Sequence, residues 1–141
     1  MRKNSGLIIL FFFLSCSYSA DTKVKSSDTL NGTWRLSAMP GELKSLKELF
    51  STRLPEITLI PDSNRIYGFT GCNDFGGVIR IKNDSITFIT PFEMTQVGCP
   101  GGGEEKLSDI FTRTRHYKIK SDSLMLYTSL GLELIFRKLN E

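Results

Sequence analysis

Residues 117–137 read YKIKSDSLMLYTSLGLELIFR, and this stretch decides the expected fold class. It contains three short apolar or alternating runs, the pattern of β-strands that bury one face. The runs are 117–120, 124–127 and 132–137. Between them stand SDS at 121–123 and LG at 130–131, which are typical of turns. The stretch therefore predicts three antiparallel strands joined by short connections.

The same pattern continues toward the N-terminus. Five further short runs predict strands: 33–36, 57–59, 65–70, 78–81 and 86–89. Two other segments, 42–50 and 104–115, repeat apolar residues every three or four positions, which predicts short helices. So many closely spaced strands favour a sheet that rolls up and hides its edges. We expect a mainly β fold: an antiparallel, barrel-like sheet of about eight strands with two short helices.

Composition limits the class of protein. The chain has 141 residues, which allows one domain plus a targeting segment. Its 18 Lys and Arg against 15 Asp and Glu give a formal net charge of only +3. Binding to nucleic acid needs a dense basic surface, so we expect no nucleic-acid partner. A hydrophobic fraction of 40% is ordinary for a globular domain and excludes a disordered or multi-span membrane chain.

The N-terminus looks like an export signal. Arg2 and Lys3 precede a nearly unbroken apolar run at residues 6–14. That run is too short to cross a bilayer, which takes about 20 residues, but it fits the apolar region of a signal peptide. We therefore expect residues 1–15 to be a signal peptide.

Cys16 follows this run and is a candidate lipidation site. Residues 13–16 read FLSC and resemble a bacterial lipobox, although Phe13 stands where Leu is common. Lipidation of Cys16 would make residues 16–29 a flexible polar tether. The alternative is cleavage by an ordinary signal peptidase near Ala20, which would leave the protein secreted or periplasmic.

Two glycine-rich segments interrupt the strand pattern. Residues 68–77 read GFTGCNDFGG, and residues 93–99 read EMTQVGC. Together with Trp34 and Leu36 they resemble the META domain (HslJ-like) family over residues 30–138. The matching positions are Gly68, Gly71, Cys72, Asn73, Phe75, Gly76, Gly77, Thr95 and Cys99. Val97 and Gly98 stand where many members have Met and Ala.

The resemblance implies a β-rich, barrel-like exported domain. The family is linked to heat-shock induction, novobiocin tolerance or secretion, with no established enzyme activity. We therefore expect a non-enzymatic, lipid-anchored envelope protein with a binding or stress-tolerance role. Two alternatives stay open: an envelope inhibitor of a lysozyme or protease, and a carrier of a small apolar ligand.

The cysteines support one more prediction. If Cys16 carries lipid, Cys72 and Cys99 remain as a pair in an oxidising compartment, which favours a disulfide. Closing that loop would contribute about 3–4 kcal/mol to stability. Two reduced, packed thiols are the alternative. A catalytic Cys–His–Asn group would need His116, the only histidine, and nothing in the sequence brings it near.

We expect no cofactor and no metal. The chain has neither the C-x-x-C nor the H-x-x-x-H spacing of zinc sites, and the glycines at 101–103 lack the Lys-Ser/Thr of a phosphate-binding loop. The expected partners are a membrane, through a lipid anchor on Cys16, and an unidentified protein. We expect the anchored protein in the cell envelope, at the outer membrane or periplasmic face. We expect a monomer whose glycine-rich loops at 71–77 and 98–103 form the contact surface.

Overall fold

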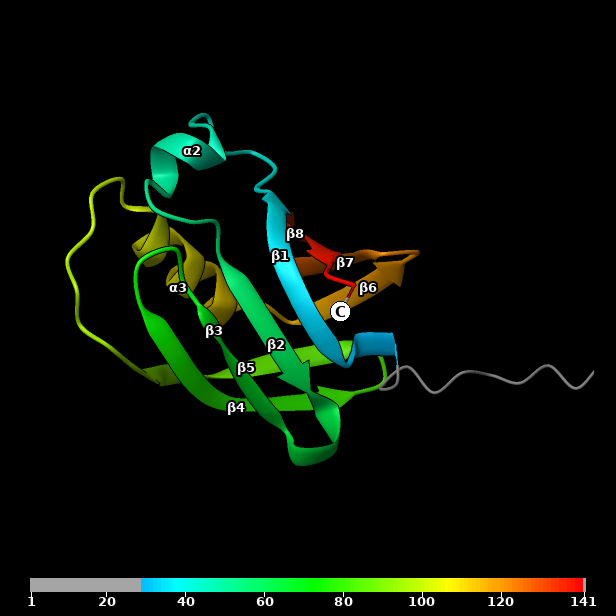
Figure 1. Ribbon diagram of the computed structural model, residues 1–141. Coiled ribbons are helices and arrows are strands. Elements are labelled where there is room, and N and C mark those ends of the chain that lie inside the picture. Colours follow the sequence, from blue (N-terminus) through cyan, green and yellow to red (C-terminus); the bar gives the residue numbers. More distant parts are fainter. Residues whose placement is uncertain (1–28, 141) are drawn as a thin grey trace, which may run out of the picture.

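The computed structural model describes residues 29–140, so the expectations for residues 1–15 and for Cys16 lie outside the described part. Eight antiparallel strands form a closed barrel in sequence order, and β1 pairs with β8 to complete the ring (Figure 1). The strands are β1 (Gly32–Ala38), β2 (Glu56–Ile60), β3 (Arg65–Phe69), β4 (Asp74–Lys82), β5 (Ser85–Met94), β6 (His116–Lys120), β7 (Ser123–Thr128) and β8 (Gly131–Lys138). The mainly β, barrel-like prediction is confirmed.

Large apolar side chains fill the interior of the barrel. Alternate residues of the strands point inward, and Trp34, Ile66 and Phe136 have no exposed surface. The indole nitrogen of Trp34 donates to the carbonyl oxygen of Leu30 at 3.0 Å, so its one polar atom is satisfied. The two-residue alternation in the sequence is therefore the alternation between the core and solvent.

Helix α3 (Gly103–Arg113) covers the weakest junction of the ring. β5 pairs with β6 through a single register position, Ser85 opposite His116. α3 connects these two strands and packs on β5, with Leu107 and Phe111 buried in the core. The ring of Phe111 lies 4.6 Å from that of Phe88 between centroids. An apolar helix face thus completes the core where strand pairing stops.

The second helix, α2 (Leu46–Leu49), is shorter than the expected segment 42–50. Ser45 caps it: the hydroxyl oxygen accepts the backbone N–H of Glu48, and the Glu48 carboxylate accepts the N–H of Ser45. This capping box sets the first helical residue, and Leu43 is left 99% exposed. The helical spacing of apolar residues overestimated this helix because Leu43 belongs to a loop.

Much of the glycine-rich segment 68–77 is strand. Gly68 lies in β3, while Phe75, Gly76 and Gly77 lie in β4, so only residues 70–73 form a turn. A Cβ at Gly68 would lie 2.2 Å from the carbonyl oxygen of Glu56 in the neighbouring strand. This glycine allows strands to approach closely, and the expectation of an open loop over 71–77 is wrong for residues 74–77.

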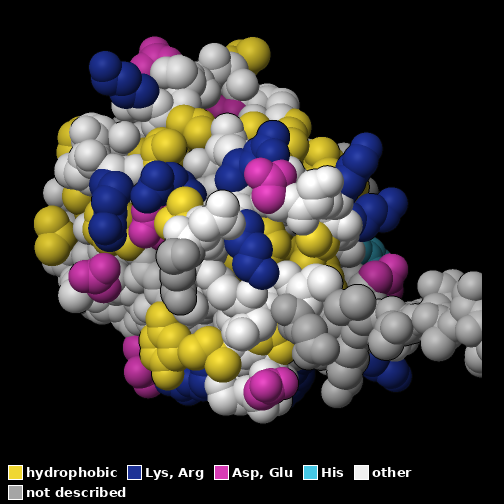
Figure 2. All heavy atoms as spheres, turned by 45° about the vertical axis from the view of Figure 1, so that its right-hand side comes forward, with side chains coloured by type: hydrophobic (Ala, Val, Ile, Leu, Met, Phe, Trp, Pro, Cys, Tyr) yellow, Lys and Arg dark blue, Asp and Glu magenta, His cyan; other side chains and the backbone are white. Residues whose placement is uncertain are grey.

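The surface carries both signs of charge. On the face in Figure 2, Lys and Arg side chains are interspersed with Asp and Glu and with apolar groups. Within residues 29–140, no helix has the length and apolar character needed to span a bilayer.

Candidate functional site

Several of the motif residues meet at one end of the barrel, around the turn at residues 70–73. Thr70 and Asn73 are 1% and 2% exposed, which is unusual for polar side chains. Gly71, between them, has φ of +95°, a conformation that other residues rarely adopt, and a Cβ there would lie 2.3 Å from the Phe50 ring. The turn therefore packs directly on the segment that follows α2.

The amide of Asn73 links this turn to the segment after β5. Its Oδ1 accepts from the Thr95 hydroxyl at 2.8 Å and from the Val97 backbone N–H at 2.7 Å. Its Nδ2 donates to the Val97 carbonyl oxygen at 2.9 Å. Both ends of the amide are thus satisfied, as a buried polar group requires.

Glu104, in the first turn of α3, completes the cluster. Its carboxylate accepts from Asn73 Nδ2 at 2.9 Å and from the Thr70 hydroxyl. A carboxylate is favoured at this position by the partial positive charge of a helix N-terminus. The cluster of Thr70, Asn73, Thr95 and Glu104 therefore joins β3, β4, β5 and α3.

The disulfide prediction is confirmed. Cys72 and Cys99 are bonded, with a Cα–Cα distance of 5.8 Å. With both sulfurs in the bond, neither is available as the nucleophile of the alternative Cys–His–Asn group. His116 lies elsewhere, in β6, where it pairs with Ser85 and Tyr127.

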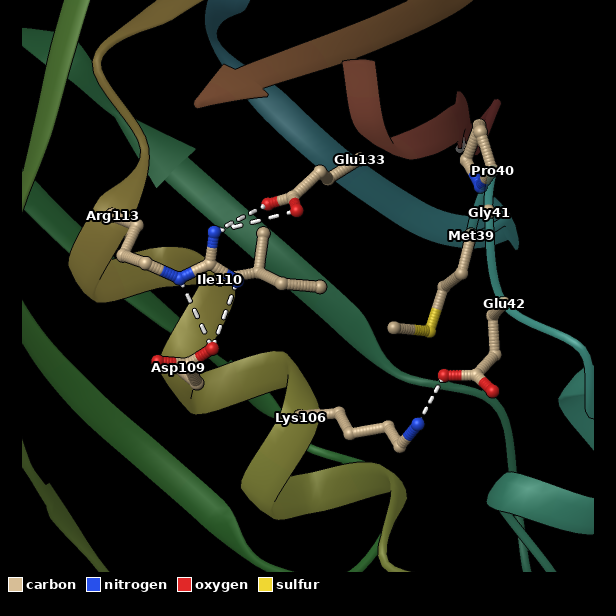
Figure 3. Close-up of a pocket in the computed structure, with 9 residues that line it drawn as sticks. All are labelled: Met39, Pro40, Gly41, Glu42, Lys106, Asp109, Ile110, Arg113 and Glu133. Atoms are coloured by element: carbon tan, nitrogen blue, oxygen red, sulfur yellow. Dashed lines mark hydrogen bonds and ion pairs between the residues drawn. The ribbon is translucent and has the colours of Figure 1, made fainter. Parts of the chain in front are cut away.

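A pocket of about 300 Å³ lies on the side of α3, between the helix, the segment after β1 and β8 (Figure 3). Met39 and Ile110, each 8% exposed, supply apolar lining. The other lining residues are Pro40, Gly41, Glu42, Lys106, Asp109, Arg113 and Glu133.

The charged side chains that line this pocket form ion pairs with one another. Arg113 contacts Asp109 at 2.8 Å and Glu133 of β8 at 3.1 Å, and Lys106 pairs with Glu42. The hydrogen bond from Lys106 lowers the pKa of Glu42, and the bond from Arg113 lowers the pKa of Asp109. Asp109 and Glu133 in turn raise the pKa of Arg113. The pairs hold α3 against the rim of the barrel.

Sequence reasoning named two members of this cluster, Asn73 and Thr95, and missed the other two. Gly71, Asn73, Thr95 and the two cysteines come together at the turn, whereas Gly68 lies in β3 and Phe75, Gly76 and Gly77 lie in β4. Thr70 and Glu104 were missed. For Glu104 the reason is that the helix dipole already explains an acid at the start of a helix. Within the described residues, no three His, Cys, Asp or Glu side chains gather in a way that could hold a metal ion.

Comparisons with known proteins agree with this fold. A model of the META domain family matches residues 27–141. A protein from Burkholderia xenovorans, solved by NMR, is similar with a TM-score of 0.63 and 21% identity, covering 100% of this chain and 99% of that one. A crystal structure of a DUF4847 family protein from Bacteroides vulgatus ATCC 8482 gives 0.55 and 11%, covering 79% and 94%. At these identities the likeness shows the fold alone. No curated protein matches the chain significantly.

Proposed function

Because the chain belongs to the META domain family, we propose that it is an exported, lipid-anchored envelope protein whose domain acts by binding and not by catalysis. The observation that carries the proposal is the Cys72–Cys99 disulfide, since such bonds persist in oxidising compartments outside the cytosol. The signal-like run at residues 6–14 and the lipobox-like FLSC at 13–16 supply the route and the anchor.

A binding role is supported because the side chains that could have served in catalysis are bonded to other parts of the protein. The two thiols are bonded to each other, and the Asn73 amide is engaged by Thr95, Val97 and Glu104. The cations lining the pocket in Figure 3 each face a carboxylate. These contacts serve to fix the segments around α3, which suits a rigid surface for a protein partner. The role that the family resemblance implies, tolerance of envelope stress, is part of the proposal.

The two alternatives differ in what supports them. A carrier of an apolar ligand needs free space in the barrel, but fully buried Trp34, Phe111 and Phe136 occupy the core. An inhibitor is itself a binding protein, and the exposed segment between β5 and α3 favours it. In Figure 1 this segment forms the left edge of the molecule, on the side opposite the start of β1. A domain tethered through its N-terminus would thus present the segment away from its anchor.

Metabolic labelling with radioactive palmitate tests the anchor. We expect label on the wild-type protein and recovery with membranes, whereas Cys16→Ala loses the label and appears in the soluble fraction. Ser17→Ala, which changes the neighbouring residue and keeps the thiol, is the matched control and should behave as wild type. An unlabelled wild-type protein would overturn the lipid anchor.

Site-directed photo-crosslinking in cells tests the binding role. Gln96 is exposed beside the motif cluster, and Lys82 is exposed at the far end of β4. A photoreactive residue at position 96 should give a discrete adduct, while the same residue at position 82 should not. Absence of any adduct from position 96, or identical adducts from both positions, would count against a specific partner at this end.

A further inference from the structure

The outer surface of β4, β5 and β6 carries a group of exposed cations, named here the basic face. Its members are Arg80, Lys82, Lys118 and Lys120. Lys82 is in register with Ser85 of β5, and Ser85 is in register with His116 of β6, so the three strands lie side by side at this point. Lys118 and Lys120 follow His116 in steps of two, which places them on the same outer face of β6. The four cations therefore belong to one continuous surface.

Few carboxylates neutralise the basic face. None of its cations forms an ion pair within residues 29–140. The turns that follow β4 and β6 contain two exposed acids, but Asp122 pairs with Arg137, which leaves Asp84. The amine of Lys118 lies 5.5 Å from the centre of the Tyr127 ring, a contact that keeps its charge. The basic face therefore keeps a positive potential, which an anionic surface complements.

The chain enters the barrel beside the basic face. The amine of Lys138 donates to the carbonyl oxygen of Thr29 at 3.3 Å, and the backbone N–H of Lys138 donates to the carbonyl oxygen of Asp122 at 2.8 Å. Asp122 lies in the turn between β6 and β7, two residues after Lys120. Figure 1 shows the start of β1 and the strand β6 on the right of the barrel, away from α2. A lipid on Cys16 would therefore anchor the molecule at the end that carries the basic face.

The linking chain lets the body reach the bilayer without holding it there. From Cys16 to Thr29 the chain can span at most about 45 Å. A tethered body meets the membrane at a high effective concentration, so that even a weak attraction sets its orientation. Anionic lipids supply such an attraction for clustered Lys and Arg side chains, over a distance of about 10 Å at 0.1 M salt.

We propose that the basic face lies against the anionic phospholipid headgroups of the membrane that carries the anchor. The inference rests on the proposed lipid anchor and adds the orientation of the domain on the bilayer. β4 runs from Asp74 at the motif end to Lys82 at the basic face, so the turn at residues 70–73 points away from the headgroups. Asp74 and Glu93 are exposed at that far end, and an anionic surface repels them. The motif end is thereby left accessible to a protein partner.

Lysine acylation on vesicles tests the orientation. The lipidated protein, purified in detergent, is added to preformed vesicles of phosphatidylcholine, with or without phosphatidylglycerol, and labelled with a membrane-impermeant amine-reactive ester. Mass spectrometry gives the labelling rate of each lysine. We expect Lys118 and Lys120 to react at least about threefold more slowly on the anionic vesicles, because the headgroups cover them and raise the local proton concentration. Lys44 and Lys47, exposed at the opposite end near α2, should react equally on both, and added salt should restore the labelling of Lys118 and Lys120.

Two charge reversals test whether the cations act as one face. Arg80→Glu with Lys82→Glu changes exposed residues of β4 and should return the labelling of Lys118 and Lys120 to the rate on neutral vesicles. Lys44→Glu with Lys47→Glu changes the net charge by the same amount at the opposite end and should leave the protection of Lys118 and Lys120 intact. Thermal unfolding of both variants checks that the fold is retained.

The outcomes separate the basic face from the lipid anchor. Protein that is recovered with both kinds of vesicle but shows equal labelling of Lys118 and Lys120 on the two would overturn the inference and keep the anchor. Loss of protection in the Lys44→Glu, Lys47→Glu variant would also overturn it, because net charge alone would then explain the effect. Protein that binds only anionic vesicles and is released by salt would overturn the anchor and support the basic face.

Discussion

Asn73 illustrates how a buried polar residue can specify a structure. Its amide lies in a region that excludes water and still makes hydrogen bonds with Thr95, Val97 and Glu104. Each bond contributes little by itself, because the unfolded chain bonds to water instead. Removing the amide is costly, however, because its bonds to Thr95, Val97 and Glu104 are all lost together and these contacts are part-buried. The hydrogen bonds of Asn73 therefore give the Gly-Cys-Asn motif a structural role that requires no bound ligand.

Replacing Asn73 by Ala should lower the free energy of unfolding by about 2–4 kcal/mol. The Val97 N–H and the Glu104 carboxylate, which are part-buried, would lose this partner, although Glu104 keeps its bond from the Thr70 hydroxyl. Urea denaturation of the purified domain measures the change. Gln96→Ala, which removes an exposed amide one residue from Val97, is the control and should change stability by less than about 0.5 kcal/mol. Equal effects of the two substitutions would contradict the structural role of Asn73.

Gly68 and Gly98 offer a second comparison between single residues. Gly68→Ala should cost more than about 2 kcal/mol, because the new Cβ would lie 2.2 Å from the backbone carbonyl oxygen of Glu56. Gly98→Ala should change stability by less than about 0.5 kcal/mol, because nothing lies within 4 Å of its Cβ position and its φ is not left-handed. Thermal unfolding of both variants measures the difference. A stable Gly68→Ala protein would show that β2 and β3 can separate without cost.

Among the elements, α3 makes polar contacts with three different parts of the barrel. Glu104 bonds the turn at residues 70–73, Lys106 pairs with Glu42 in the segment after β1, and Arg113 pairs with Glu133 of β8. Leu107, Ile110 and Phe111 face the core between these contacts. The polar pairs thus set the position of the helix, while apolar burial supplies most of the driving force.

The Lys106–Glu42 pair predicts a dependence of stability on pH. The pKa of Glu42 lies below its ordinary value of 4.5, so its carboxylate stabilises the folded protein above that pH and the contribution disappears as the pH falls through the lowered pKa. Glu42→Gln should therefore be less stable than wild type at pH 7, with the difference shrinking below about pH 4.5.

Denaturation of both proteins between pH 3 and pH 7 measures this convergence. Glu93→Gln is the control: Glu93 is exposed and makes no ion pair within the described residues, so its substitution should leave the pH profile unchanged. Added salt should reduce the Glu42 effect, since the pair lies at the surface. A difference between wild type and Glu42→Gln that stays constant down to pH 3 would contradict the assignment.

The sequence was sufficient to predict where the strands lie, but not which side chains from distant segments come into contact. Alternation places Trp34 and Leu36 on one face of β1, and the expected strands 117–120 and 124–127 match β6 and β7 closely. The disulfide was predicted from two cysteines in a chain expected to be exported. The Asn73–Glu104 contact could not be predicted, because it joins residues 31 positions apart whose meeting depends on where α3 docks. Likewise, the glycines of β4 looked like loop residues, because glycine is favoured both in flexible loops and in strands that other groups approach closely.

At the scale of the whole molecule, the barrel is closed unevenly. β7 and β8 pair along most of their length, whereas β5 and β6 share one register pair, Ser85 with His116, with backbone hydrogen bonds from Tyr117 to Asp84 and from Ile86 to Arg115 on either side of it. The ring is completed there by α3, whose Phe111 contacts Phe75, Phe88 and Phe92. Local openings in proteins occur where few hydrogen bonds and contacts must break. The junction of β5, α3 and β6 is therefore where this barrel should open first.

Native-state hydrogen exchange tests this expectation with two matched substitutions. Phe111 and Phe136 are both buried, at 1% and 0% exposure, but Phe111 covers the β5–β6 junction and Phe136 lies in the fully paired β8. Phe111→Leu should reduce protection first in α3, in β6 and in the part of β5 beyond Ser85, leaving β7 and β8 protected. Phe136→Leu should instead reduce protection across the barrel, because its site opens only when the whole ring unfolds. If both variants lose protection uniformly, α3 and the strands unfold as one cooperative unit and the junction has no independent opening.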